Sequence, residues 1–210
     1  MKIRFFYLLL PLLFAGCATP PPAELQLNDS WRTQQAKLES LTHWSLSGKL
    51  GIFTPEERKT VNIYWQQFDQ NFSIHLSGPL GITVLDIEKK SSDTVIIDGE
   101  EYLSTDAEQL IEKLTNMVLP ITQLQQWIKG NPVDADYQLD DNLQVNSLFG
   151  FDRDNGQWLI NYTDYRTVEH TNLPHKLQLT HDNLRLKFAI SKWETFSPLQ
   201  SNIENKHEKN

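Results

Sequence analysis

The chain lacks the features on which several protein classes depend. It has a single cysteine, Cys17, so no disulfide can form within it, and its stability must come from a packed core. It has 19 Lys and Arg against 27 Asp and Glu, and a net charge of −8 argues against nucleic acid binding and against broad adhesion to anionic lipid. Its six histidines are scattered, and neither zinc-ligand spacing nor a G-x-S-x-G nucleophile motif occurs. We therefore expect no catalytic residue, no metal site and no cofactor.

The N-terminus has the pattern of an export signal. Lys2 and Arg4 precede an apolar run, residues 5–14, which is too short to cross a bilayer as a permanent helix. Ala15-Gly16-Cys17 then resembles the small-residue end of a bacterial lipobox, with Phe14 where Leu is usual. This pattern predicts cleavage after residue 16 and lipidation of Cys17. An ordinary signal followed by a free thiol is the alternative.

The remaining chain is predicted to form one domain. We expect a signal peptide at residues 1–16, a lipidated Cys with a Pro-rich tether at 17–30, a single domain at 31–196 and a polar tail at 197–210. Three consecutive prolines at residues 20–22 stiffen the tether, and the first helix is expected at residues 31–41.

Most of the domain has the alternation of apolar and polar residues that is typical of strands with one buried face. The alternation covers residues 44–52, 61–66, 72–77, 176–180 and 184–190, and residues 82–87 and 94–97 are expected to continue the sheet. His181-Asp182-Asn183 is expected to turn the last hairpin.

The middle of the chain changes to a helical period. Thr105 to Glu108 has the spacing of a capping box, and an apolar stripe follows from Ala107 to Leu114. A second short helix is expected from Pro120 to Gly130. Because the apolar face of a long antiparallel sheet must be covered, we expect a mainly β fold with α: an open, incomplete antiparallel β-barrel or strongly curved sheet covered by these short helices.

Several short motifs, in a fixed order, resemble the LolB family. They are Gly78-Pro79-Leu80-Gly81, Asp106-Ala107-Glu108-Gln109-Leu110, Trp127-Ile128-Lys129-Gly130-Asn131-Pro132, Trp158-Leu159-Ile160-Asn161-Tyr162, Leu173-Pro174 and a closing Trp193. Asn155-Gly156-Gln157-Trp158 departs from the family, where Gly directly precedes the Trp.

The resemblance implies an outer-membrane lipoprotein receptor on the periplasmic face, anchored by lipidated Cys17. Such a receptor accepts lipoproteins from a periplasmic carrier of the same fold and inserts them into the inner leaflet of the outer membrane. It needs neither ATP nor a metal, so the implied partners are the carrier, the acyl chains of the cargo and outer-membrane lipid. We expect no enzyme activity and a monomer.

Two kinds of site follow from the sequence and the resemblance. Large apolar residues of the alternating strands are candidates for an acyl-chain cavity, although they would equally suit a filled core: Trp44, Leu46, Ile63, Trp65, Phe72 and Ile74. Leu80, between Pro79 and Gly81 at a predicted turn, either folds back onto the sheet or, as the resemblance implies, contacts the membrane.

Two other function classes remain alternatives. Acidic pairs such as Glu56-Glu57 lie in polar loops and are typical of solvated turns, so an enzyme is disfavoured. A non-enzymatic scaffold lipoprotein of an outer-membrane assembly machine would share the lipobox and the sheet, but it would not need an apolar cavity.

Overall fold

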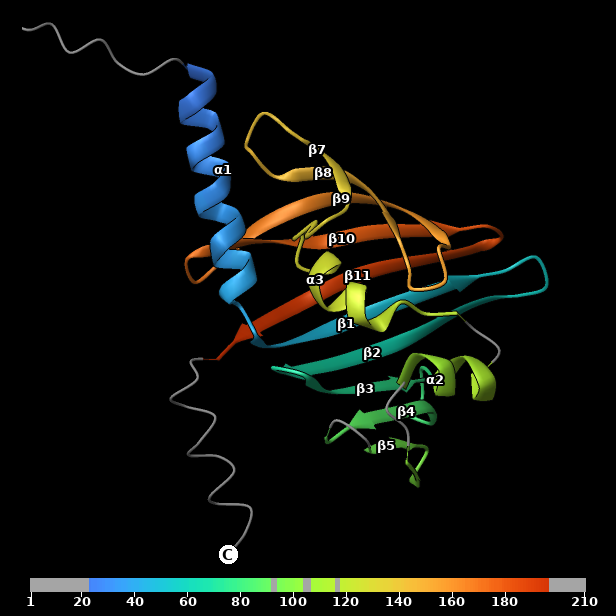
Figure 1. Ribbon diagram of the computed structural model, residues 1–210. Coiled ribbons are helices and arrows are strands. Elements are labelled where there is room, and N and C mark those ends of the chain that lie inside the picture. The colour runs from blue at the N-terminus through green and yellow to red at the C-terminus, as the bar shows by residue number, and fades with distance from the viewer. Residues whose placement is uncertain (1–22, 92–93, 104–106, 116–117, 197–210) are drawn as a thin grey trace, which may run out of the picture.

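The computed structural model describes residues 23–196 except 92–93, 104–106 and 116–117. Its body is an 11-stranded antiparallel sheet in the order β6-β5-β4-β3-β2-β1-β11-β10-β9-β8-β7 (Figure 1). The sheet does not close, since β6 and β7 are its two free edges. The expected open, curved sheet with short helices is confirmed.

The strands are β1 (His43–Phe53), β2 (Arg58–Phe68), β3 (Asn71–Ser77), β4 (Thr83–Lys89), β5 (Thr94–Ile97), β6 (Glu100–Leu103), β7 (Asp136–Leu139), β8 (Val145–Phe151), β9 (Gln157–Val168), β10 (Thr171–His181) and β11 (Leu184–Thr195). The helices are α1 (Ala23–Ser40), α2 (Ala107–Thr115) and α3 (Ile121–Trp127). Both α2 and α3 lie in the connection between the two edge strands, β6 and β7.

The structure differs from the sequence-based expectation at the first helix. Helix α1 begins at Ala23 and not at residue 31, so residues 23–30, expected as tether, are helical. No Pro or Gly lies between Ala23 and Ser40, so nothing in this stretch breaks the helix. The predicted signal peptide, Cys17, the start of the predicted capping box and the polar tail lie outside the described residues.

The first and last strands of the chain, β1 and β11, pair with each other in the middle of the sheet. Residues of β1 and β11 face one another from Trp44–Thr195 to Phe53–Arg185, with a shift in register at Ser47 and Gly48. At this shift the backbones approach so closely that a Cβ on Gly48 would lie 2.3 Å from the carbonyl oxygen of Ala189. Glycine is therefore required where the two halves of the sheet join.

A tryptophan cluster lies beneath this join. The ring centroid of Trp44 is 5.3 Å from that of Trp65 and 5.3 Å from that of Trp193. The indole N–H of Trp193 donates to the carbonyl of Pro174 at 2.9 Å, so its polar edge is satisfied inside the core. Tilted aromatic pairs add about 0.5–1.5 kcal/mol each beyond their buried area.

Helix α1 is held at two places. The Trp31 indole N–H donates to the hydroxyl of Tyr137 in β7 at 2.8 Å. At the C-terminal end of α1, the buried ammonium of Lys129 donates to the carbonyls of Leu38 and Leu41, both at 2.8 Å. These carbonyls belong to the last turn of α1 and the residue just beyond it, where a cation is favourable. Burial lowers the pKa of Lys129 to about 8 despite the opposing effect of nearby Glu39.

The Lys129 ammonium predicts a pH dependence of stability. The pKa of Lys129 is about 8 in the folded protein, against 10.5 for a lysine in water. Between pH 8 and 10.5 the unfolded chain therefore binds more protons than the folded one. Stability relative to a Lys129→Met variant should therefore rise by roughly 1 kcal/mol per pH unit across this window. Urea unfolding at about pH 7.5 and about pH 9.5 measures the difference, and an equal gap at both pH values would contradict the account.

Candidate functional site

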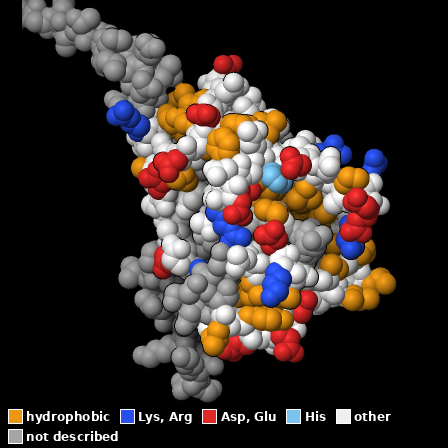
Figure 2. All heavy atoms as spheres, turned by 45° about the vertical axis from the view of Figure 1, so that its right-hand side comes forward, with side chains coloured by type: hydrophobic (Ala, Val, Ile, Leu, Met, Phe, Trp, Pro, Cys, Tyr) orange, Lys and Arg blue, Asp and Glu red, His pale blue; other side chains and the backbone are white. Residues whose placement is uncertain are grey.

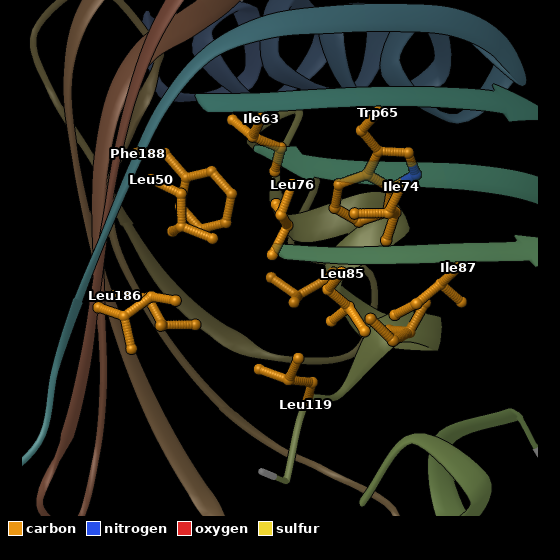
Figure 3. A pocket seen from close by; sticks show the side chains of 13 residues that line it. Leu50, Ile63, Trp65, Ile74, Leu76, Leu85, Ile87, Leu119, Leu186 and Phe188 are labelled. Carbon is orange, nitrogen blue, oxygen red and sulfur yellow. The ribbon is translucent and has the colours of Figure 1, made fainter. Parts of the chain in front are cut away.

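An apolar cavity lies between the inner face of the sheet and α3 (Figure 3). Its volume is about 50 Å³, and every side chain that lines it is apolar. The lining comes from five strands, from α3 and from the segment before α3: Leu50, Ile52, Ile63, Trp65, Ile74, Leu76, Leu85, Ile87, Leu119, Ile121, Leu124, Leu186 and Phe188. A void without polar partners holds no ordered water, so the cavity suits hydrocarbon.

The six residues predicted to form a cavity divide into two groups. Ile63, Trp65 and Ile74 line the cavity. Trp44 and Leu46 are buried in the core but do not line it, and Phe72 borders a separate hollow that also contains charged side chains. A role of these six residues in binding acyl chains stays a prediction.

Several lining residues were not among the sequence candidates. Leu186 and Phe188 belong to the alternating pattern of β11, and Ile121 and Leu124 belong to the apolar side of the second predicted helix. The sequence pattern therefore placed these four residues on apolar faces. To identify them as cavity residues one must also know which strands face α3, and this depends on the strand order.

The cavity is small for a ligand site. Pockets for organic ligands have volumes of roughly 300–1,000 Å³, against about 50 Å³ here. A cavity of this volume is too small for an acyl chain, which fits only if part of the wall moves. Helix α3 and Leu119, in the segment before it, are the parts of the wall that are not in the sheet.

The C-terminal end of α3 is firmly fixed. Trp127 is 3% exposed, and its carbonyl accepts a hydrogen bond of 2.8 Å from the buried hydroxyl of Tyr162. A Cβ on Gly150 would lie 2.5 Å from the Trp127 ring, so this glycine makes room for the indole. The two residues after α3, Ile128 and Lys129, are also buried.

The N-terminal end of α3 is held through α2. The carboxylate of Glu108 accepts a hydrogen bond of 2.6 Å from the backbone N–H of Thr122. Arg153 lies 3.9 Å from Glu108 and 3.7 Å from Glu112, so one guanidinium joins two carboxylates of α2. Thr122 itself is exposed, whereas the neighbouring Ile121 is 3% exposed and lines the cavity.

Leu80 lies at the tip of the β3–β4 hairpin and is 90% exposed. Two backbone hydrogen bonds shape the turn: Gly78 N–H to Ile82 O at 2.8 Å, and Gly81 N–H to Gly78 O at 3.0 Å. Gly81 has φ of 77°, which disfavours other residues there. The side chain does not fold back onto the sheet. Ile82 (70% exposed) and Val84 (43% exposed) extend the apolar tip.

Among the described residues, no three His, Cys, Asp or Glu side chains lie close enough to hold a metal ion. None of the described helices is long and apolar enough to span a membrane.

Comparison with known sequences identifies a family. Residues 42–193 match the family described as "Outer membrane lipoprotein LolB". The outer-membrane lipoprotein LolB of Psychromonas ingrahamii is 47% identical over 184 residues, which are 87% of this chain and 91% of that protein. The protein of the same name from Aeromonas hydrophila is 37% identical over 92% of this chain and 97% of its own length.

Solved structures share the fold at low sequence identity. A LolA superfamily protein from Nitrosomonas europaea has a TM-score of 0.53 and 6% identity, covering 81% of this chain and 94% of that one. A DUF1329 family protein from Desulfovibrio piger has a TM-score of 0.55 and 6% identity over 84% of this chain and 94% of its own. These likenesses concern the fold alone.

Two leucines of the same hairpin provide a test of this geometry. Leu76 is 6% exposed and lines the cavity, whereas Leu80 is 90% exposed. Leu76→Ala should lower the free energy of unfolding by about 2–5 kcal/mol, because it enlarges a buried void. Leu80→Ala should change it by less than about 0.5 kcal/mol. Urea unfolding measures both, and equal losses would show that the tip is packed.

Proposed function

Because the chain belongs to the LolB family of outer-membrane lipoproteins, we propose that it is a lipoprotein receptor. It takes lipoproteins from a soluble periplasmic carrier, holds their acyl chains, and inserts them into the inner leaflet of the outer membrane. The observation that carries this proposal is the cavity between the sheet and α3, whose lining is entirely apolar. No bond is made or broken in this process.

The affinity of the cavity for its cargo comes from the hydrophobic effect. Each methylene group removed from water contributes roughly 0.8 kcal/mol. An acyl chain therefore prefers the side chains of Ile63, Trp65 and Ile74 to solvent, whatever the sequence of the attached protein. Such a site accepts many lipoproteins, because it recognises only their common lipid.

Cargo binding requires the cavity to expand, and the contacts of α3 indicate how. Its C-terminal end is fixed by the buried Trp127 and the hydrogen bond from Tyr162. Its N-terminal end combines Ile121, which faces the cavity, with the polar bond from Thr122 to Glu108. We expect α3 to pivot about Trp127, so that Ile121 and Leu119 move away from the sheet. Release of the Glu108 contact opens the cavity, and its return closes it.

The location of the receptor follows from its N-terminus. Lipidated Cys17 anchors it to the periplasmic face of the outer membrane, and the segment up to α1 connects the anchor to the folded domain. The carrier has the same fold and diffuses freely, because it has no such anchor. The receptor acts as a monomer.

A transfer experiment tests the proposal directly. Carrier loaded with a lipoprotein is mixed with this protein, and the cargo is followed by co-purification. We expect transfer in one direction, from the carrier to this protein. Cargo that stays on the carrier, together with no binding of a fluorescent fatty acid, would favour a scaffold lipoprotein instead.

Leu80 provides a separate test of the insertion step. Leu80→Glu should fold and accept cargo, yet deliver at least tenfold less of it to vesicles, because a carboxylate resists entry into hydrocarbon. Leu103→Glu is the matched control: Leu103 is 84% exposed but lies in β6 and pairs with Thr94 of β5. Thr94 accepts a hydrogen bond from Lys90, which follows the end of β4 opposite the tip. Normal delivery by Leu80→Glu, or an equal loss in both variants, would exclude a specific role of the tip.

The pivot of α3 predicts faster exchange when its N-terminal contact is removed. Glu108→Ala leaves the Thr122 N–H without its acceptor, so stability should fall by about 1–3 kcal/mol. A fluorescent fatty acid should then enter several-fold faster, measured by stopped flow. Glu112→Ala removes an Arg153 partner but keeps the Thr122 contact, and should leave the rate near wild type. Equal rates in the two variants would contradict the pivot.

A further inference from the structure

The four central strands have a charge composition opposite to that of the whole chain. Strands β1, β2, β10 and β11 contain seven of the 19 Lys and Arg but only one of the 27 Asp and Glu, Glu194. The other acidic residues lie elsewhere, and Figure 2 shows Asp and Glu side chains spread over the face that it displays. The central sheet is therefore cationic in an acidic protein.

Strand register brings these cations together on the outer face. Lys49 pairs with Ala189, which pairs with Lys176. Lys187 lies two residues before Ala189 in β11 and pairs with Gly51. Arg185 lies two residues before Lys187 and pairs with Phe53. Residues two apart share a face of the sheet, and the residues between them, such as Phe188, are buried in the core.

Arg58 completes the group, because it pairs with Phe53 from the other side. We call Lys49, Arg58, Lys176, Arg185 and Lys187 the basic face, and all five are exposed. Neighbouring strands lie about 4.8 Å apart, and residues two apart on one strand lie about 7 Å apart. The basic face therefore spans roughly 15 Å across the strands and roughly 15 Å along them.

Most of this charge is not neutralised. Lys176 lies 3.3 Å from Asp164, but the other four cations form no ion pair with any carboxylate in the described part of the chain. Arg185 and Lys187 lie instead over the ring of Phe53, at 4.9 and 5.7 Å from its centroid. A ring holds a cation in place and leaves its charge free for a partner.

The basic face is continuous with the apolar hairpin tip. Along one row of the sheet, Lys49 pairs with Asn62, and Asn62 pairs with Ser77 at the end of β3. The Asn62 amide donates to the carbonyl of Gly78 at 3.2 Å, which ties β2 to the turn that presents Leu80. No acidic residue lies between the cations and the tip along this row.

We propose that the outer face of the central sheet binds anionic phospholipid headgroups of the bilayer, with the apolar tip inserted beside it. Aliphatic side chains beside unpaired cations match the two layers of a membrane surface, hydrocarbon and phosphate. An acidic protein would complement the cations, but cations continuous with the exposed aliphatic tip of Leu80 and Ile82 fit a bilayer better. The proposal rests on the proposed function only for the insertion of the tip.

Vesicle binding tests the proposal with the mature chain, residues 17–210, produced without the signal so that it carries no lipid. The vesicles contain phosphatidylethanolamine with one quarter of either phosphatidylglycerol or phosphatidylcholine. We expect at least tenfold tighter binding to the anionic vesicles at low salt, and loss of most of this preference at high salt. Equal binding to both compositions would overturn the proposal.

Charge reversal then locates the surface. The double variant Lys49→Glu and Lys187→Glu should lose the preference for anionic vesicles, at about fivefold or more for each cation. The neutral double variant Lys49→Gln and Lys187→Gln should lose part of this preference. It replaces the charge-reversal variant in the test if urea unfolding shows that the reversal impairs folding. Lys37→Glu with Lys113→Glu changes the net charge equally at exposed positions of α1 and α2, and should keep the preference.

The outcomes separate this proposal from the proposed function. A reversal variant that still prefers anionic vesicles overturns the basic face as a lipid site, whatever happens in cargo transfer. If that variant also accepts cargo poorly from the carrier, the cations bind an acidic protein instead. Failure of wild-type transfer with intact anionic preference would leave the lipid site standing and remove only the receptor function.

Discussion

The pairing of β1 with β11 is the constraint on which the rest of the structure depends. It joins the two ends of the domain into the middle of one sheet, so that the strands before and after form two arms. Both arms contact α3: β3 and β4 through the cavity lining, and β8 and β9 at Trp127. The connection between the two edge strands therefore crosses the face of the sheet that the arms share. Helices α2 and α3 lie in this connection, so the cavity and its cover are consequences of the strand order.

The cover meets two opposing requirements. An apolar sheet face exposed to water is costly, so α3 must pack on it; yet a perfectly filled interior would leave no place for cargo. The structure meets both requirements with one short helix. Ile121, Leu124 and Trp127 are buried on its inner side, and a void of about 50 Å³ remains beneath it. On its outer side, the backbone of exposed Thr122 is held by one carboxylate, that of Glu108.

Much of the fold could be predicted because strand alternation is a local property. It identified β1 to β5, β10 and β11, and the order of short motifs identified the family. Alternation could not separate Trp44, which packs between two tryptophans, from Ile63, which lines the cavity, since both point inward. The exposed position of Leu80 depended on whether the turn folds back, and only the structure shows that it does not. The basic face was out of reach, because Lys49 and Lys187 meet only through the register of β1 and β11.

The separation of charge has a consequence for how the molecule approaches a surface. With seven cations and one carboxylate on its central strands, inside a chain of net charge −8, the protein is an electric dipole. A negatively charged plane repels such a body as a whole at long range, yet exerts a torque that turns its positive side inward. Screening in salt water confines this torque to roughly the last 10 Å, about the length of a side chain and a headgroup together. The protein therefore adopts its orientation by rotating just before it touches the charged surface, and it does not need to diffuse along that surface to find it.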